Sequence, residues 1–403
     1  MTNRDTYTNS NIETSGGNEG TLVAYGRGRA TRLATDVAGL SGEGSRVILI
    51  ADPEIAQADL LQGVSINLAA SGCEVWLNTS IAGEPKAKDV DTAIEQARDH
   101  RADIVVAVGG GSVIDVAKLV GALAVDGQGV GAYGLGAKAF PDRRLPVIAV
   151  PTTAGTGAEV TRTSIFAAPD GTKLWAWGEG LHPEVAVLDP ELTVTLPRGL
   201  TVATGVDALV HAVEATTNRT FLPGIDLPAM QAIGLVRRYL PRAVAQPDDL
   251  EARGAMLRAA CLAGRAIDRA GTGVAHALGH ALGSLAGVPH GRAVALGLDA
   301  ALSWNAEAAP DRHAAVADAF GLQVDPTASD EALADELAAV FNRFLRELEL
   351  PVSLAGDGLA EKDAERVAEA TLRPENAPML QANCRHVGEA EALSLSRALL
   401  TAD

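Results

Sequence analysis

The residues best suited to chemistry are histidines that recur at helical spacing. His276 and His280 lie four positions apart in a Gly-rich apolar stretch, so on a helix they share one face. His290 follows between Pro289 and Gly291, a context that predicts a turn folding back. Imidazole is the commonest transition-metal ligand, so this stretch is a candidate for part of a metal site.

A second pair with the same spacing lies upstream. Asp207 and His211 are also four positions apart in an apolar helical pattern. A carboxylate combined with several imidazoles suits Fe(II) or Zn(II). A single histidine is more often a structural residue of a helix face or an N-cap, but two such pairs and a third element together favour a divalent metal site.

Glycines mark a candidate site for an anionic cofactor. Gly110, Gly111 and Ser112 stand where an apolar run, 103–108, meets a helical pattern. Glycines let the backbone approach a bulky anion, and the N–H groups of a helix N-terminus suit a pyrophosphate. Ser112 and Asp115 also have capping-box spacing, so a purely structural role stays open for both.

Two further loops follow apolar runs. Asp52 follows the apolar run 46–51. An acidic residue at the end of such a strand commonly binds the ribose hydroxyls of NAD and disfavours NADP. The residue type and position fit equally well with Asp52 as the N-cap of the next helix. Thr152, Thr153 and Thr156 follow the run 145–150, and their hydroxyls can hydrogen-bond a polar ring. A plain Gly/Thr loop is the alternative.

Two kinds of hydrophobic pattern divide the chain near Pro197. Before it, apolar runs alternate with helical patterns, which predicts parallel βαβ units and a doubly wound sheet in a domain spanning 21–197. After it, long helical periodicities predict a mostly α domain spanning 198–403. The polar residues 1–20 predict a disordered tail.

Composition excludes several classes of protein. The 403 residues are too many for one ordinary core, and the net charge of −18 argues against nucleic acid or an anionic membrane as partner. No apolar stretch is long enough to span a membrane. The three cysteines, Cys73, Cys261 and Cys384, form no CxxC motif, which fits a reducing cytoplasm.

In combination, these motifs resemble those of the iron-containing (group III) alcohol dehydrogenases. The resemblance extends from about Leu22 to Thr401. The matching segments occur in family order: Gly109–Ser112 with Asp115 and Lys118, then 151–159, 189–192, 205–211, the His276/His280 pair and 289–291. The resemblance implies an α/β Rossmann-like N-terminal domain, an all-α C-terminal domain as in dehydroquinate-synthase-like proteins, and an active site in the cleft between them. We also expect a homodimer or higher homo-oligomer.

The resemblance also assigns roles to individual residues. It implies that the metal is held by Asp207, His211, His276 and His290, and that His280 lies near the nicotinamide as a proton relay. It places the pyrophosphate of NAD at Gly110, Gly111, Ser112 and Asp115. It places Thr152, Thr153 and Thr156 near the phosphate and nicotinamide, Asp52 at the position that favours NAD, and Lys173 near the cofactor ribose.

The implied activity is hydride transfer between NAD(H) and a small alcohol or aldehyde, with Fe(II), or alternatively Zn(II), as Lewis acid. Maleylacetate reductases form a sister branch, but the presence of Asp207 favours the metal-dependent branch. Metal-dependent lyases of the same superfamily and a non-catalytic dinucleotide-binding protein remain alternatives from other classes.

Two arginines raise a hypothesis about the substrate. Arg265 and Arg269 lie four positions apart on the helical pattern ahead of His276. In the resembling family this segment contributes to the substrate pocket, so two guanidiniums there could bind a carboxylate, phosphonate or sulfonate on a short aldehyde. The alternative is that both arginines pair with Asp268 or other carboxylates of this acidic protein.

Overall fold

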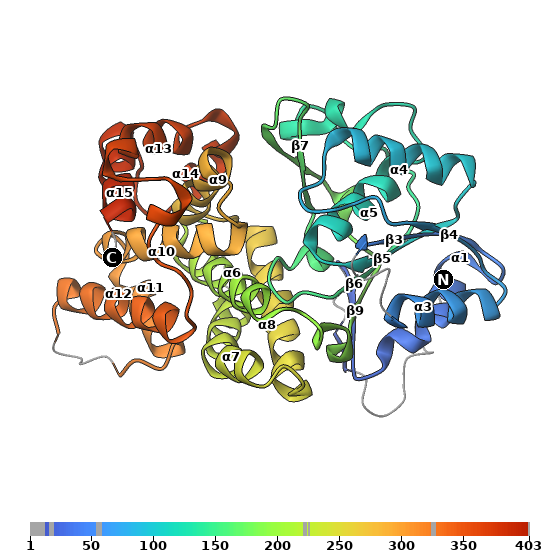
Figure 1. Ribbon diagram of the computed structural model, residues 1–403, viewed down its shortest axis with the longest axis horizontal. Helices are drawn as coiled ribbons and strands as arrows, with labels where there is room; N and C mark the ends of the chain where they lie inside the picture. Colours follow the sequence, from blue (N-terminus) through green and yellow to red (C-terminus); the bar gives the residue numbers. More distant parts are fainter. Residues whose placement is uncertain are drawn as a thin grey trace. The chain divides into compact units, whose positions relative to one another are not determined.

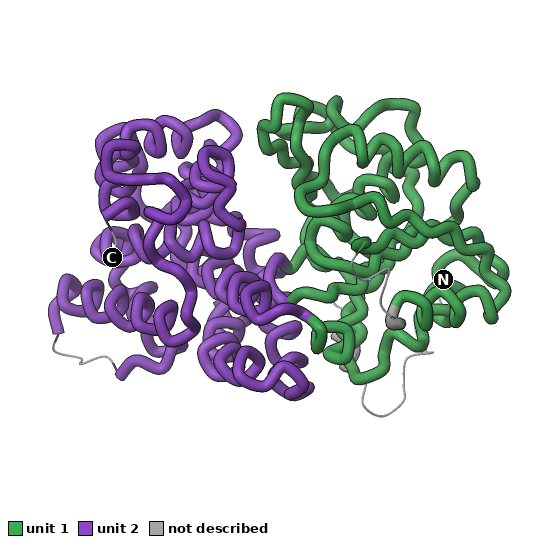
Figure 2. The backbone as a smooth tube through the Cα atoms, viewed as in Figure 1, with its two compact units in different colours: residues 1–153, 157–195 green, residues 154–156, 196–403 purple. Residues whose placement is uncertain are grey.

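The computed structural model describes residues 13–15, 20–53, 59–220, 224, 226–323 and 328–401. The chain forms two compact units, which Figure 2 distinguishes by colour. The first unit runs to Thr153 and from Gly157 to Thr195, and the second holds Ala154–Thr156 and everything from Leu196 onward. The division after Thr195 lies next to the expected boundary at Pro197. The segment Ala154–Thr156 interrupts the first unit along the sequence but belongs to the second, which the sequence did not indicate.

The first unit is built on a seven-stranded sheet with the order β1-β2-β9-β6-β5-β3-β4. All neighbouring strands pair in parallel except β1 and β2, which are antiparallel. The parallel sheet predicted from the alternating pattern is therefore confirmed. The strands are β1 (Glu13–Ser15), β2 (Leu22–Tyr25), β3 (Arg46–Ala51), β4 (Glu74–Asn78), β5 (Ile104–Gly109), β6 (Val147–Pro151) and β9 (Val185–Leu188).

Helices cover both faces of this sheet, as Figure 1 shows. The helices are α1 (Leu33–Ser41), α3 (Asp59–Ala70), α4 (Ala87–Asp99) and α5 (Gly111–Leu123). Successive residues of β3 alternate between the two cores: Ile48 and Ile50 pack with α4 and α5, and Val47 and Leu49 pack with α1 and α3. Because both faces are buried, the central strands read as continuous apolar runs, which is what made them recognisable in the sequence.

Three parts of this unit differ from expectation. A separate antiparallel hairpin, β7 (Thr163–Ala167) with β8 (Lys173–Trp177), was not predicted, and neither was the short strand β9. Residues 13–15 form β1, which corrects the expectation of a wholly disordered tail; the other tail residues, 1–12 and 16–19, lie outside the described part of the chain. A three-residue polar strand carries no periodicity that a sequence pattern could reveal.

The described residues of the second unit form helices and no strands, which confirms the all-α prediction. Figure 1 shows them as the yellow-green to red part of the chain. The α-helices are α6 (Arg198–Thr217), α7 (Asp226–Ala245), α8 (Leu250–Ala270), α9 (Val274–Ala286), α10 (His290–Ala306), α11 (Pro310–Ala319), α12 (Asp330–Glu347), α13 (Ala364–Thr371), α14 (Ala377–Ala382) and α15 (Glu389–Thr401).

Glycines let three of these helices approach one another closely. A Cβ atom on Gly291 of α10 would overlap the carbonyl of Ala203 in α6, and one on Gly297 would overlap the carbonyl of Ala275 in α9. A Cβ on Gly279 of α9 would lie 2.7 Å from Cγ1 of Val294. The backbones of α6, α9 and α10 therefore meet at distances that only glycine permits.

The cysteines and the lengths of the helices agree with what the sequence predicts. The three cysteines are free thiols. Among the described residues, no helix is both long and apolar enough to cross a bilayer.

Candidate metal centre and cofactor-binding edge

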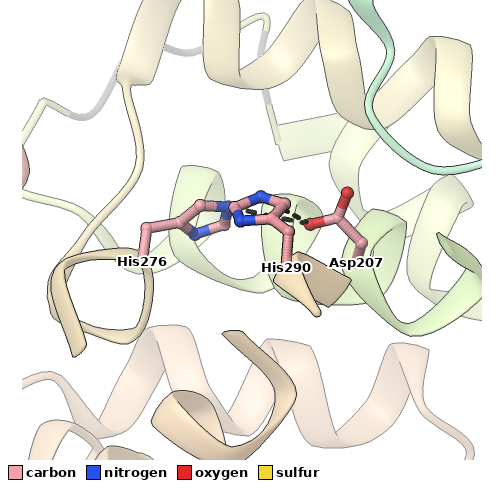
Figure 3. Close-up of side chains that lie close together, drawn as sticks. All are labelled: Asp207, His276 and His290. Atoms are coloured by element: carbon pink, nitrogen blue, oxygen red, sulfur yellow. Dashed lines mark ion pairs between the residues drawn. The ribbon is translucent and has the colours of Figure 1, made fainter. Parts of the chain in front are cut away.

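Three imidazoles converge on one carboxylate oxygen in the second unit. Oδ1 of Asp207 lies 3.7 Å from Nε2 of His211, 3.8 Å from Nε2 of His276 and 3.7 Å from Nε2 of His290. Figure 3 shows Asp207, His276 and His290 directed toward one another, and one ligand atom of each lies within 4.8 Å of the others. Donors bound to one tetrahedral metal at about 2.1 Å are about 3.4 Å apart, so small side-chain adjustments would bring Asp207, His276 and His290 to coordination distance. His211 approaches the same carboxylate oxygen but falls outside this 4.8 Å group, so its role as a fourth ligand stays a prediction.

The burial of these donors indicates that a cation completes the cluster. Within the described structure, Oδ1 of Asp207 and Nε2 of His276 are buried and have no hydrogen-bond partner. A buried polar atom without a partner costs free energy, whereas a metal ion would satisfy both atoms at once. One carboxylate and three imidazoles form a donor set that suits Fe(II) or Zn(II).

The ionisation of this cluster also favours metal binding. Burial lowers the pKa of His276 well below its ordinary value, and the nearby His211 lowers it further, so this imidazole is neutral and can donate a lone pair. Burial raises the pKa of Asp207, and His211 partly opposes that rise. A cation beside Asp207 would stabilise its charged form.

Glu214, which the sequence analysis did not single out, fixes the orientation of His276. Its Oε2 lies 2.5 Å from Nδ1 of His276, and its Oε1 accepts a hydrogen bond from the N–H of Ala275 at 2.8 Å. Burial raises the pKa of Glu214 to about 7. With Nδ1 directed at Glu214, the other nitrogen of His276 faces Asp207 as a lone-pair donor.

The N-terminus of α9 is held where His276 requires it. Oδ1 of Asn383 accepts a hydrogen bond from the N–H of Val274 at 3.2 Å, beside the bonds that Glu214 accepts. A Cβ atom on Gly273 would lie within 2.9 to 3.0 Å of oxygens of Glu214, Asn218 and Asn383. Gly273 therefore gives these polar side chains the space to cap the helix.

His280 occupies a different position from the four converging residues. Its ring centroid lies 5.8 Å from that of His290, and its Nδ1 lies 3.1 Å from Oδ1 of Asn376. The amide nitrogen of Asn376 donates to the carbonyls of Ala370 and Thr371, so its oxygen must accept from His280. Nδ1 of His280 consequently carries the proton, and Nε2 is the unprotonated nitrogen of the neutral ring.

The structure brings several residues of the expected cofactor site together at one edge of the sheet. Ala51 of β3 pairs with Val108 of β5, which lies opposite Val150 of β6. The loops that follow these strands, which carry Asp52, Gly109–Gly111 and Thr152–Thr153, therefore emerge side by side at the carboxyl ends of parallel strands. Ligands of open α/β sheets bind at this edge.

The glycine loop is packed closely against its neighbours. A Cβ atom on Gly109 would lie 2.7 Å from Cβ of Val113, and one on Gly110 would lie 3.4 Å from Cγ2 of Thr153. The N–H of Thr152 donates to the carbonyl of Gly109 at 3.0 Å. Gly110 caps α5 with no side-chain hydrogen bond, so the capping role considered for Ser112 is not the one observed.

Other expected cofactor residues have partners of their own. Asp115 is buried, forms an ion pair with Lys118 at 2.9 Å and accepts from the N–H of Ile165 at 2.9 Å. Lys173 begins β8 and forms an ion pair with Glu84 at 3.1 Å. These contacts account for both side chains structurally, so their roles toward a cofactor stay predictions.

The remaining predicted residues lie in the second unit. Thr156 belongs to the short Ala154–Thr156 segment. Arg265 and Arg269 lie on α8, the first half-buried and the second exposed. Their roles toward the substrate likewise stay predictions.

Sequence signals existed for only some of the supporting residues. Glu214 stands three positions after His211 and seven after Asp207, so helical periodicity places it on the same face of α6. Asn376 lies 96 positions from His280, whose ring it contacts, and Asn383 lies 109 positions from Val274, whose backbone N–H it accepts from. No local pattern connects such distant positions.

Comparisons with known proteins agree with this geometry. The sequence profile of the family described as "Iron-containing alcohol dehydrogenase" matches residues 21–190, and that of "Fe-containing alcohol dehydrogenase family, C-terminal" matches residues 201–400. The chain is 31% identical to an NAD-dependent methanol dehydrogenase of Bacillus methanolicus, over 85% of this chain and 89% of the relative. It is 33% identical to long-chain-alcohol dehydrogenase 1 of Geobacillus thermodenitrificans, over 92% and 94%.

A solved structure is similar along nearly the whole chain. The sulfoacetaldehyde reductase of Bifidobacterium kashiwanohense in complex with NAD+ matches with a TM-score of 0.86 and 29% identity, covering 96% of this chain and 98% of that one. With two adjoining family profiles and several relatives above 30% identity, the chain belongs to the iron-containing alcohol dehydrogenase family and is an oxidoreductase. The fold and the family expected from the sequence are confirmed.

Proposed function

We propose that this enzyme transfers a hydride between NAD(H) and a small alcohol or aldehyde, with a divalent metal held by Asp207, His211, His276 and His290. The observation that carries the proposal is the convergence of three imidazole nitrogens on a buried oxygen of Asp207 that has no hydrogen-bond partner among the described residues. When bound, Fe(II) or Zn(II) supplies Lewis acidity toward the substrate oxygen, and NAD supplies the hydride acceptor.

Each residue near this cluster has a distinct part in the proposal. Glu214 holds His276 in the tautomer that faces Asp207. His280, whose Nδ1 donates to Asn376, has Nε2 as its basic ring nitrogen, the atom that would take the proton that an alcohol releases. We therefore assign His280 as the proton relay and not as a metal ligand.

For the cofactor we propose the edge formed by β3, β5 and β6. The N–H groups at the start of α5 are suited to the pyrophosphate, and the glycines there leave space for it. The residues proposed to bind NAD are Asp52, Gly110, Gly111, Ser112, Asp115, Thr152, Thr153, Thr156 and Lys173.

The experiment is a turnover assay at the reduced-nicotinamide absorbance band. The metal-free protein is given NADH and a panel of aldehydes, or NAD and a panel of alcohols, with and without added Fe(II) or Zn(II). We expect turnover only with metal. A dinucleotide-binding protein without catalysis would bind NADH but convert none of the panel, and a lyase would consume its substrate without any change in NADH; either result would refute the proposal.

Cofactor preference tests the position of Asp52. Its negative charge at the ribose would repel the 2′-phosphate of NADP, so we expect NAD(H) to be preferred and the Asp52→Gly variant to lose much of that preference. The measurement is kcat/KM for both cofactors in both proteins. Equal use of NAD and NADP by the unaltered enzyme would place Asp52 away from the ribose.

A second, narrower candidate is a substrate that carries an anionic group. The relative with a solved structure is named a sulfoacetaldehyde reductase, and α8 presents Arg265 and Arg269 four positions apart. We expect kcat/KM for a sulfonate- or carboxylate-bearing aldehyde to exceed that for a neutral aldehyde of equal length. The preference should fall in Arg265→Ala and Arg269→Ala. If the enzyme still prefers the anionic aldehyde after both substitutions, residues other than Arg265 and Arg269 cause that preference.

We also propose that the enzyme works in the cytoplasm as a homodimer or larger homo-oligomer. Three free thiols suit a reducing compartment. Sedimentation equilibrium over a range of protein concentrations tests the assembly state, and a monomer throughout that range would contradict it.

A further inference from the structure

The first unit contains a basic cavity at the opposite edge of the sheet from the proposed cofactor site. It has a volume of about 550 Å³, within the range typical of small-molecule sites. It lies where β3, β5 and β6 begin, between α4 and the segment before β6. Its apolar lining includes Leu40, Ala97 and Leu145.

The lining is strongly cationic although the whole protein is acidic. Five arginines, Arg46, Arg98, Arg101, Arg143 and Arg144, line the cavity against a single carboxylate, Asp103. The chain as a whole carries a formal net charge of −18. A concentration of guanidiniums at one place in an acidic protein creates a local field that attracts anions.

Three of these arginines are anchored by the fold. Arg46 binds Asp103 through two hydrogen bonds, at 3.0 and 2.7 Å. Arg144 forms an ion pair with Glu184 at 2.6 Å. Arg98 donates to the carbonyls of Leu123 and Ala124, which end α5. These contacts hold three guanidiniums rigidly around the cavity.

The other two arginines remain available. Among the described residues, none forms a hydrogen bond or an ion pair with the guanidinium of Arg101 or of Arg143, and both residues are exposed. Two guanidiniums without partners beside three fixed ones give an anionic group both a strong field and free hydrogen-bond donors.

The backbone turns at Arg101 in a conformation that few residues with a side chain adopt. Arg101 follows the end of α4 with φ of 50°, in the left-handed region that disfavours residues with a Cβ. The chain uses glycine at some comparable ends, such as Gly287 after α9 with φ of 67°, and Glu349 has φ of 56° at the equivalent position after α12. The turn at Arg101 costs some stability and places its guanidinium at the cavity.

We propose that this cavity binds a phosphorylated ligand, with its phosphate groups on Arg101 and Arg143 and any apolar body against Leu40, Ala97 and Leu145. The arginine fork matches phosphate oxygens in geometry and charge. The site is separate from the cofactor edge because it lies at the amino ends of the same parallel strands whose carboxyl ends carry Asp52, Gly110 and Thr152. The ligand is either a nucleotide or an inorganic polyphosphate, since both offer the same group.

The test is isothermal titration calorimetry, in which pyrophosphate, ADP or adenosine is added to the full-length protein and the heat of binding is measured. Saturating NADH is present throughout, so that a probe cannot report the cofactor site. We expect pyrophosphate and ADP to bind and adenosine to fail. ADP binding more tightly than pyrophosphate identifies a nucleotide, and equal affinities identify an inorganic ligand; either ranking supports the site.

The matching variant is Arg101→Gly combined with Arg143→Ser. Glycine suits a φ of 50°, so this protein should fold at least as stably as the parent. We expect its affinity for pyrophosphate and ADP to fall about tenfold or more, with the NADH affinity unchanged. The charge-matched control replaces two exposed arginines of the second unit, Arg366→Ser with Arg397→Ser, and should bind as the parent does. No binding at millimolar concentration, or equal loss in the control, would overturn the proposal.

Discussion

At the scale of single residues, the cluster depends on Oδ1 of Asp207, the one atom that all three Nε2 atoms approach. We predict that Asp207→Ala and His276→Ala each lose bound metal and nearly all turnover, because an incomplete donor set cannot hold the ion. His280→Ala should keep the metal and lose rate. The measurements are metal content by mass spectrometry and kcat for each variant. If His280→Ala loses the metal and His276→Ala keeps it, then His280 is the metal ligand and His276 is not.

Glu214 gives a second prediction, which rests on geometry. Glu214→Gln has only one oxygen to replace two, so either His276 or the N–H of Ala275 loses its acceptor. We expect metal affinity to fall by about 10- to 100-fold, as is typical when the partner of a metal-bound histidine is altered. A chelator-competition titration measures it. Glu369→Gln, an exposed carboxylate on α13, is the control and should leave the affinity unchanged.

The sequence predicted the converging side chains better than it predicted their supports. Asp207 with His211, and His276 with His280, have helical spacing, and His290 stands between a proline and a glycine. The resemblance assigned the roles of these residues. Asn376, which orients His280, lies 96 positions away in a segment without any periodic pattern. Which distant side chain reaches a histidine is decided by tertiary packing, and a single sequence does not contain that information.

At the scale of elements, the cluster exists because α6, α9 and α10 pack at glycine contacts. Gly291→Ala should push α10 away from the Ala203 carbonyl of α6. Overpacking of this kind costs about 1–3 kcal/mol, and the displacement of His290 should weaken metal binding as well. Denaturant unfolding and metal titration measure the two effects. Gly199→Ala, in the exposed first turn of α6 with nothing within 4 Å of the added atom, is the control and should be neutral or slightly stabilising.

The elements themselves were predictable wherever burial produces a regular pattern. Both faces of β3, β5 and β6 are covered, so each strand is a continuous apolar run, and α9 runs from Val274 to Ala286 as its periodicity predicts. The β7–β8 hairpin was not predictable because apolar and polar residues do not alternate with burial along its strands: Ser164 is buried in β7, whereas Trp177 is exposed in β8. The contacts of Asp115 and Lys118 with this hairpin were hidden for the same reason.

At the scale of the whole molecule, the metal site and all of the proposed NAD site except Thr156 draw on different units. Asp207, His211, His276 and His290 all belong to the second unit, whereas Asp52, Gly110 and Thr152 belong to the first. A ligand stabilises the part of a protein that it binds, by about 4 kcal/mol when present at a thousand times its dissociation constant. Metal and NADH should therefore protect different sets of backbone amides.

The prediction concerns metal removal, measured by hydrogen exchange on the full-length protein with and without a chelator. We expect chelation to speed exchange in α6, α9 and α10, because Oδ1 of Asp207 and Nε2 of His276 are then buried without a partner, and to leave β3, β5 and β6 unchanged. Asp207→Ala serves as the control, because a protein that binds no metal should not respond to the chelator. Faster exchange in β3, β5 and β6 as well would mean that the metal stabilises the chain as one cooperative block, and an absence of change in α6 would mean that these four side chains hold no ion.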